Sequence, residues 1–500
     1  MSRRLRALAL LVAALAVVAP LTPLTPPRAV ATGCEGEPAA EERLLPRETR
    51  ALLALARALP LETRIGQLLI PGFVGTEPDA GLLDRAARDR VGGLFLLARN
   101  VRSEEQLRRL TAQLDDATAG ATGGLRPFLA TDFEGGIVNA LRAITGNTPS
   151  AAQLAARGEE GVEAQGIADA AALRWLGLNT DLAPVADVLT APSGVIGTRS
   201  FSSAAAPAAA LSRAYLRGLR AGGVLGVMKH FPGHGATSGD SHVLLPLVDR
   251  SLEQLWDTDL LPYRQAVEAQ ELQAVMMGHL SVPAIDPEMP TSISRRAVGG
   301  LLRGELGFDG LVMTDELKMR AISERYGVIE AALLALEAGV DVVLADWTGS
   351  EQDAVFRGLI AACRAGELSS ARVDWSVARV LRLKLAYGLA APAIVERYDA
   401  VVQTLAQEDA PASEAPESMP AGETEAAPAG ETEGAPPEPS PTPMPTSVPA
   451  PAPTSVSTQP TPASIQPTPA PPTPTMSVTP SPSPSPSATR TATATRTPAG

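Results

Sequence analysis

Short apolar runs alternate along this chain with longer segments whose hydrophobic positions recur at helical spacing, between about residues 64 and 347. Short runs this uniformly apolar are typical of strands buried on both faces of a parallel sheet. Ser103 with Gln106 and Ser251 with Gln254 have the capping-box spacing, which predicts a helix start after each serine. The eight strand candidates are Ile65–Ile70, Val91–Leu97, Pro127–Ala130, Leu182–Val185, Val224–Met228, Ala274–Met277, Leu311–Met313 and Val340–Ala345.

Eight strand candidates that are each followed by a helix candidate predict an α/β fold of the (β/α)8 TIM-type barrel kind, in a single catalytic domain. An open, doubly wound sheet is the alternative. Polar residues follow the predicted strand ends, and in a parallel barrel all these ends open onto one face, where active sites are built. We therefore expect Asp132, Lys229, His230, His279, Asp315 and Asp346 to converge on that face.

Composition changes sharply near the C-terminus. Of the 46 prolines, 25 follow residue 410, and no aromatic residue follows Tyr398. A segment of this kind cannot bury enough apolar area to offset its chain entropy. We expect a linker at 32–44, the catalytic domain at 45–392, a short helix at 393–407 and a disordered tail rich in Pro, Thr and Ser at 408–500.

The N-terminus has the pattern of a signal peptide at 1–31. Three arginines precede an apolar run over 7–19, and Ala29-Val30-Ala31 offers a small-residue cleavage site. This predicts a secreted or cell-surface protein, with an uncleaved N-terminal anchor as the alternative. Cys34 and Cys363 are the two cysteines. Cys34 could carry a lipid, although a plain thiol is the favoured interpretation because Cys34 lies far past the apolar run.

The formal net charge of −13 argues against a nucleic-acid partner, because phosphate binding needs a basic surface. Part of this acidity comes from the repeat AGETE at 421–425 and 429–433, in the tail.

Three of the four histidines lie within 13 residues, in the segment KHFPGHGATSGDSH that contains His230, His234 and His242. Its glycines and proline make a helix improbable, so we expect a strand end followed by a long loop. Asp240 lies two residues before His242 and can hydrogen-bond the ring, which suits an imidazole that donates and later accepts a proton. A capped surface histidine, or a zinc site made by the histidines and the aspartate, are the alternatives.

Asp315 follows a predicted buried strand in GLVMTDEL. Retaining glycoside hydrolysis needs a nucleophile and an acid/base on opposite sides of the scissile bond, and Asp315 and His242 could fill these roles. A helix cap is the alternative for Asp315. Asp132, which precedes two glycines that allow close approach to a ligand, is a candidate sugar contact with Lys229 and Arg199.

These motifs together resemble glycoside hydrolase family 3, in its β-N-acetylhexosaminidase branch. The resemblance runs from about Leu61 to Leu389, and KHFPGHG followed by DSH is its most specific part. The other matching segments are LETRIGQLLIPGF, VGGLFLLARN, TDFEGG, NTDLAPVADV, GTRSF, VMMGHLSVPAID, GLVMTDELKM and RVLRLKLAYGL.

The resemblance implies a (β/α)8 fold and retaining, exo-acting hydrolysis of terminal β-linked N-acetylglucosamine, from cell-wall fragments or chitooligosaccharides. It implies Asp315 as the nucleophile and His242 with Asp240 as the acid/base pair. It also implies no metal and no organic cofactor, and substrate contacts by Asp132, Arg199, Lys229 and His230. We expect a monomer that could associate with the cell wall or the membrane surface.

The chain departs from the family pattern at Ile137 and Ala140, where arginines are usual and Arg142 lies close by, and at Gly235-Ala236-Thr237, where the family has GHG-D-T. The departure leaves the catalytic pair intact and affects the expected substrate detail. Phosphorolysis, with phosphate in place of water, is an alternative function. A non-catalytic protein that binds wall glycans is an alternative of another class.

Overall fold

The computed structural model describes residues 42–237 and 239–409. The chain divides into two units, 1–415 and 416–500, and all described residues belong to the first unit. The predictions for the signal peptide, for Cys34 and for the tail from 410 onward therefore lie outside the described residues.

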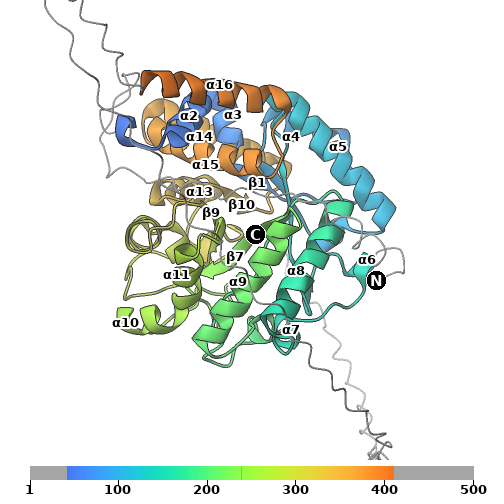
Figure 1. Ribbon diagram of the computed structural model, residues 1–500, viewed down its shortest axis with the longest axis vertical. Coiled ribbons are helices and arrows are strands. Elements are labelled where there is room, and N and C mark those ends of the chain that lie inside the picture. The colour runs from blue at the N-terminus through green and yellow to red at the C-terminus, as the bar shows by residue number, and fades with distance from the viewer. Residues whose placement is uncertain (1–41, 238, 410–500) are drawn as a thin grey trace, which may run out of the picture. The chain divides into compact units, whose positions relative to one another are not determined.

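Parallel strands form the centre of this unit (Figure 1). One sheet has six strands in the order β2-β3-β6-β7-β8-β9, and β1 pairs with β10 in a separate two-stranded parallel sheet. A short antiparallel hairpin, β4-β5, follows β3. The bounds are β1 Leu69–Pro71, β2 Gly93–Leu96, β3 Phe128–Thr131, β4 Phe133–Gly135, β5 Val138–Asn139, β6 Thr180–Asp181, β7 Leu225–Phe231, β8 Ala274–Met277, β9 Leu311–Thr314 and β10 Val343–Ala345.

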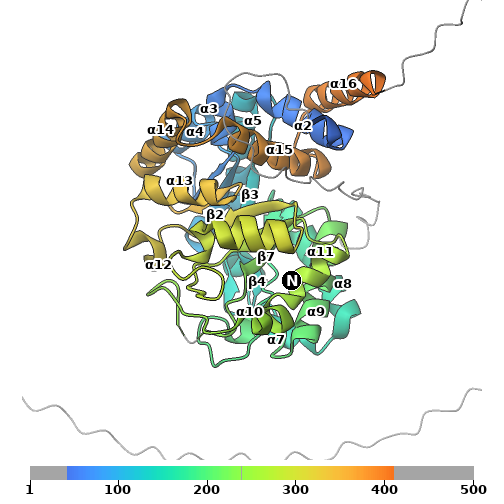
Figure 2. The ribbon, with the colours of Figure 1, turned by 90° about the vertical axis from the view of Figure 1, so that its left-hand side faces the viewer.

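Helices lie outside the strands in both ribbon views (Figures 1 and 2). The α-helices are α2 Arg47–Arg57, α3 Leu61–Gly66, α4 Ala80–Arg88, α5 Glu104–Thr122, α6 Arg142–Thr145, α7 Ala151–Ala155, α8 Gly158–Trp175, α9 Ala205–Ala221, α10 Leu252–Gln254, α11 Leu261–Glu268, α12 Arg320–Ser323, α13 Val328–Ala338, α14 Gly349–Ala365, α15 Ser370–Ala386 and α16 Pro392–Glu408. Two π-helical segments, Leu255–Asp259 and Arg296–Glu305, complete the longer elements.

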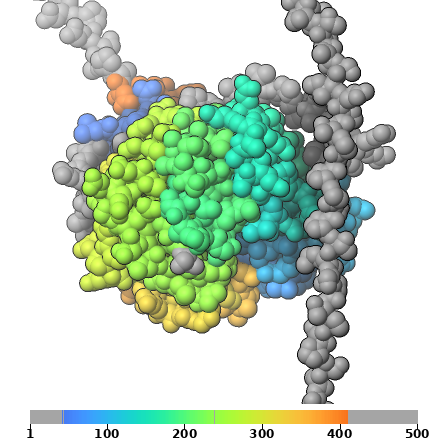
Figure 3. All heavy atoms as spheres, turned by 90° about the horizontal axis from the view of Figure 1, so that it is seen from below, coloured from blue at the N-terminus to red at the C-terminus, as the bar shows by residue number. Residues whose placement is uncertain are grey.

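Helices α8 and α9 lie side by side in both views, where Gly166 approaches the backbone of Gly218 too closely to leave room for a side chain. Viewed from below, residues from the middle of the chain, coloured teal to yellow-green, make up the exposed face (Figure 3). Within the described part of the chain, no helix has both the length and the hydropathy needed to cross a membrane.

The predicted α/β class is confirmed, and seven of the eight predicted runs overlap a parallel strand. The run Ile65–Ile70 is wrong in its first half, where α3 ends at Gly66, because an apolar run alone does not separate a helix end from a strand. The run Leu182–Val185 is displaced, since β6 is Thr180–Asp181 and ends before Pro184, which has no amide to continue a ladder.

Both predicted helix starts are confirmed. The Ser103 hydroxyl accepts a hydrogen bond from the Gln106 amide at 3.2 Å and begins α5. The Ser251 hydroxyl accepts one from the Gln254 amide at 3.2 Å, and the Gln254 side chain accepts one from the Ser251 amide at 2.9 Å. The capping-box pattern therefore predicted both helix starts correctly.

A buried ionic cluster anchors the starts of β9 and β10, at the end opposite their polar strand-end residues. Asp341 is fully buried and contacts Arg303 at 2.6 Å and Arg379 at 3.3 Å. Asp341 also accepts a hydrogen bond from the backbone amide of Val312 in β9, at 3.0 Å. A buried carboxylate needs such partners to remain ionised, and together they fix the strand that leads to Asp315.

Helix α15 packs against this same end of the strands, with Val380 and Leu383 in the cluster of inward-facing strand residues. Lys384 on this helix is fully buried, donates to Gln67 Oε1 at 2.6 Å and lies 5.2 Å from the centre of the Phe128 ring. Burial lowers the pKa of Lys384 to about 7, because a charged ammonium loses its hydration there.

The pKa of Lys384 predicts how stability changes with pH. Between pH 7 and 10.5 the unfolded chain binds the proton and the folded chain does not, so folding becomes more favourable as pH rises. In Lys384→Met this contribution is absent. Urea unfolding at pH 7 and pH 9.5 should show the wild type gaining roughly 2–3 kcal/mol relative to the variant.

Lys318→Met is the matched control, because Lys318 is partly exposed and paired with Glu351 at 2.9 Å. Because this variant keeps Lys384, it should gain stability between pH 7 and pH 9.5 as the wild type does. Parallel pH dependence in the wild type and Lys384→Met would contradict a neutral Lys384 in the folded protein.

Candidate active site

Lys229 occupies the centre of a cluster of charged side chains at the carboxyl ends of the strands. It lies inside β7, with only 2% of its surface exposed. Its Nζ contacts Asp132 Oδ1 at 2.6 Å and Glu134 Oε1 at 2.7 Å. Burial alone would lower the pKa of Lys229, but the two carboxylates outweigh burial and raise it, so the ammonium is charged.

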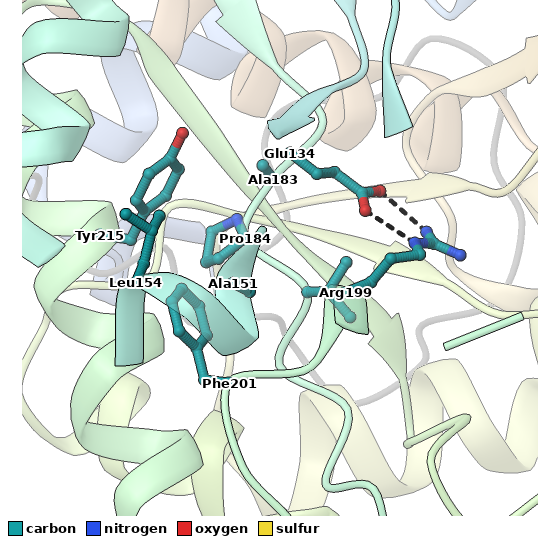
Figure 4. A pocket seen from close by; sticks show the side chains of 9 residues that line it. Glu134, Ala151, Leu154, Ala183, Pro184, Arg199, Phe201 and Tyr215 are labelled. Atoms are coloured by element: carbon teal, nitrogen blue, oxygen red, sulfur yellow. Dashed lines mark hydrogen bonds and ion pairs between the residues drawn. The ribbon is translucent and has the colours of Figure 1, made fainter. Parts of the chain in front are cut away.

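Arg199 completes this cluster from the short 3-10 helix Gly197–Arg199. It makes a bidentate contact with Glu134, at 2.7 Å and 2.8 Å, and the two side chains point toward each other in Figure 4. Burial would raise the pKa of Glu134, but Lys229 and Arg199 lower it to about 2. We call Asp132, Glu134, Arg199 and Lys229 the polar wall.

An apolar pocket lies behind the polar wall (Figure 4). Glu134 and Arg199 line one side, and Phe201, Leu154 and the Tyr215 ring line the other. Such surroundings exclude bulk water from the ion pair and strengthen its attraction.

His230 lies next to the polar wall and is oriented by Asp187. The ring Nδ1 is 2.7 Å from Asp187 Oδ2, and Nε2 is 3.4 Å from the Arg199 guanidinium. Asp187 also accepts the His234 amide at 2.7 Å. Burial would raise the pKa of Asp187, but His230 and His234 lower it to about 2, so one buried carboxylate holds two parts of the histidine segment.

Asp315 lies immediately after β9. Its amide donates to the Met277 carbonyl at 3.0 Å, and its Oδ1 accepts the Glu316 amide at 2.8 Å. The helix-cap alternative is wrong, because the next helix, α12, begins at Arg320 and has no side-chain cap. Burial would raise the pKa of Asp315, but His230, His279 and Lys229 lower it, which favours an ionised carboxylate near the polar wall.

His242 and Asp240 lie on the loop after β7, and their predicted hydrogen bond is present. His242 Nδ1 is 2.8 Å from Asp240 Oδ1, and the same oxygen accepts the His242 amide at 2.9 Å. The His242 side chain is 67% exposed, in contrast to the buried wall. Among the described contacts, none joins His242 to Asp315.

The histidines of the zinc alternative have different hydrogen-bond partners, although the rings of His230 and His234 lie 5.8 Å apart, edge to face. His230 bonds Asp187, His242 bonds Asp240, and His234 lies 2.8 Å from the Thr237 hydroxyl. The described residues contain no group of three His, Cys, Asp or Glu side chains that could hold a metal ion.

Two details of the prediction need correction. Lys229 and His230 lie within β7, which runs to Phe231, and not beyond the strand end. The glycines after Glu134 do not make room for a ligand: a side chain at Gly135 would lie 2.1 Å from the Pro149 carbonyl, and one at Gly136 would lie 2.6 Å from Ser150. Their positive φ angles of 81° and 58° form the turn of the β4-β5 hairpin.

Sequence reasoning missed Glu134 and Asp187 as site residues. Glu134 is in TDFEGG and Asp187 in NTDLAPVADV, both segments that matched the family pattern. Their burial could have been suspected from the apolar residues around them, since a carboxylate in such a segment needs a partner. Their actual partners, Arg199 and His230, are distant in sequence and become visible only in the fold.

The unusual positions 137 and 140 lie on the hairpin that carries Glu134. Ile137 is 63% exposed, and Ala140 is buried with 8% exposed. Arg142 does not take the place of an arginine in the polar wall: its guanidinium bonds the Gly136 carbonyl, and its side chain is exposed.

Comparison with known proteins agrees with this fold. The family model for the glycosyl hydrolase family 3 N terminal domain matches residues 60–383. Beta-hexosaminidase LpqI of Mycobacterium tuberculosis is 40% identical over 398 residues, which cover 76% of this chain and 97% of that protein. Its solved structure has 39% identity and a TM-score of 0.59, covering 67% of this chain and 96% of LpqI.

A glycoside hydrolase family 3 β-N-acetylglucosaminidase from Paenibacillus is also similar, with 35% identity and a TM-score of 0.63 over 69% of this chain and 68% of that chain. The chain belongs to glycoside hydrolase family 3. It is therefore a glycoside hydrolase.

The charge balance of the polar wall predicts the effect of Glu134→Gln. The variant leaves Lys229 with one carboxylate and Arg199 with none, and breaking a buried ion pair costs roughly 3–5 kcal/mol at pH 7. Because the pKa of Glu134 falls from 4.5 to about 2 on folding, its stabilisation is present above pH 4.5 and is lost as pH falls toward 2. Urea unfolding at pH 7 and pH 3 should show a difference that shrinks at the lower pH.

The matched control is Glu163→Gln, which removes a partly exposed pair with Arg217 at 2.9 Å and should cost at most about 1 kcal/mol. Equal losses in the two variants, or a loss in Glu134→Gln that does not change with pH, would contradict the assigned charge state.

Proposed function

We propose that this protein is a retaining, exo-acting β-N-acetylglucosaminidase, with Asp315 as the nucleophile and His242 with Asp240 as the acid/base pair. The observation that carries the proposal is a partly buried carboxylate of lowered pKa at a strand end, beside a charged polar wall. The names of the relatives, β-hexosaminidase and β-N-acetylglucosaminidase, support the substrate class.

In the first step Asp315 attacks the anomeric carbon and forms a covalent glycosyl ester, while the C–O bond to the leaving group breaks. His242 gives its proton to the departing oxygen. In the second step His242 takes a proton from water, whose oxygen displaces Asp315 and returns the anomeric carbon to its original configuration. The Asp240 contact to Nδ1 orients the ring so that Nε2 faces outward for both transfers.

Asp132, Arg199, Lys229 and His230 are the proposed sugar contacts. Asp132 keeps 24% of its side chain exposed although it is paired with Lys229, so its outer oxygen can accept a sugar hydroxyl. A binding site recognises sugar hydroxyls by means of charged hydrogen-bond donors and acceptors that are held in fixed positions. Because ion pairs already hold these side chains in place, substrate binding costs little further side-chain entropy.

We also infer that the strands close into a (β/α)8 barrel. Single parallel bridges, Gly72 with Phe95 and Met313 with Val342, support this closure, because they link the β1-β10 pair to β2 and β9. The domain at 45–392 and export to the cell wall or cell surface are part of the same proposal. They follow from the sequence of the N-terminal segment and from the tail composition.

Asp315→Asn tests the nucleophile. It preserves the shape of the side chain and removes the attacking charge, so turnover of an aryl N-acetylglucosaminide should fall by about 10³-fold or more. The unfolding midpoint should stay close to that of the wild type.

Asp346→Asn is the matched control, since Asp346 follows the neighbouring strand β10 and pairs with Arg99. It should cost far less activity than Asp315→Asn. Wild-type turnover in Asp315→Asn would remove Asp315 from the mechanism. Running the assays with and without phosphate, and testing for sugar 1-phosphate, distinguishes phosphorolysis from hydrolysis.

His242→Ala tests the proton donor. Its loss of activity should be about 10²–10⁴-fold for a poor leaving group and much smaller for a strongly acidic phenol, which departs without a proton. The measurement is kcat/KM across a series of aryl N-acetylglucosaminides of decreasing leaving-group pKa. An equal loss across the whole series would show that His242 does not act as the acid.

A further inference from the structure

Asp181 is a fully buried carboxyl group at the end of β6, next to the polar wall but not part of it. Its Oδ1 accepts the Phe133 amide at 3.1 Å. Phe133 is the residue between Asp132 and Glu134, the two carboxylates that hold Lys229. The Asp181 side chain is therefore hydrogen-bonded to the short backbone segment that carries both partners of Lys229, Asp132 and Glu134.

Among the described residues no cation forms an ion pair with Asp181, since Lys229 contacts Asp132 and Glu134. Burial and, after it, Asp169 raise the pKa of Asp181, and they outweigh the opposing effects of the Phe133 amide and Lys229. Asp169 itself bonds the Tyr215 hydroxyl at 2.9 Å, and burial raises its pKa to about 6. The role that the geometry gives Asp181 is that of hydrogen-bond acceptor for the Phe133 amide.

We propose that Asp181 is a positioning residue, which fixes the Asp132–Glu134 segment through the Phe133 amide so that both carboxylates meet Lys229. On the hairpin side the segment is held by the pairing of Phe133 with Asn139 and by the bond from the Ala140 amide to the Asp132 carbonyl at 2.9 Å. Asp181 supplies the anchor on the side of the parallel strands. Without it, the segment can shift away from β7.

Asn179, which directly precedes β6, provides a matched control for Asp181. Asn179 Oδ1 accepts the Leu129 amide at 2.9 Å, so it also anchors β3 through a backbone amide. It lies two residues before Asp181 and contacts no member of the polar wall in the described structure. Asn179→Ala should lower the unfolding midpoint without moving Asp132 or Glu134.

The direct test is a pair of crystal structures, of Asp181→Ala and Asp181→Asn. In Asp181→Ala the contacts of Lys229 with Asp132 and Glu134, now 2.6 Å and 2.7 Å, should lengthen or break. In Asp181→Asn the amide oxygen still accepts the Phe133 amide, so both contacts should remain. Unchanged contacts in Asp181→Ala, or broken contacts in Asp181→Asn, would overturn the proposal, whatever the protein hydrolyses.

Kinetics provide a second test, which rests on the proposed function. For an aryl N-acetylglucosaminide, Asp181→Ala should raise KM roughly tenfold or more, because a displaced binding group costs affinity out of proportion to the distance moved. Asp181→Asn should restore KM to within about threefold of the wild type, and Asn179→Ala should leave it unchanged.

The outcomes separate the two proposals. If the wild type does not hydrolyse the substrate, the proposed function fails, and the crystal structures still decide the role of Asp181. If Asp181→Ala does not fold, Asp181→Asn still decides: a large rise in its KM would show that the charge of Asp181, and not its acceptor oxygen, is required. An equal rise of KM in Asn179→Ala and Asp181→Ala would reduce Asp181 to a general stabilising residue.

Discussion

The structure of the site depends on the charge of one buried ammonium. Removing Lys229 from water costs several kcal/mol unless opposite charges lie beside it, and Asp132 and Glu134 do so at 2.6 Å and 2.7 Å. Glu134 is in turn shared with Arg199. Two cations and two carboxylates therefore balance. Because they come from the junction of β3 and β4, from β4, from β7 and from the segment after β6, their attraction also fixes these segments relative to one another.

The two proposed catalytic groups differ in how they are held, and the difference suits their roles. Asp315 follows a buried strand and is bonded through its own amide and its carboxylate, so its position is set by the fold. His242 is 67% exposed on a loop and bonded mainly to its neighbour Asp240. An attacking oxygen needs a fixed position near the anomeric carbon, whereas a proton donor must meet both a leaving group and water.

The sequence predicted the α/β class, most strands and the residues that stand out by type or spacing. Apolar runs marked the buried strands, and the cluster of histidines marked the segment around His230. It did not show Glu134 or Asp187 as parts of the site, because each gains its role from a partner 65 or 43 residues away. Local pattern also misplaced β6, where Pro184 interrupts an apolar run, and it could not show whether Asp315 caps a helix.

The same charge balance bears on the hairpin positions Ile137 and Ala140, where the family pattern has arginines. A buried glutamate on this hairpin would need a cation nearby, and an arginine at either position could supply it. Here Lys229 and Arg199 already supply that charge and lower the pKa of Glu134 to about 2. The absence of arginine at 137 and 140 therefore leaves Glu134 compensated, with Ile137 63% exposed and Ala140 buried on the hairpin.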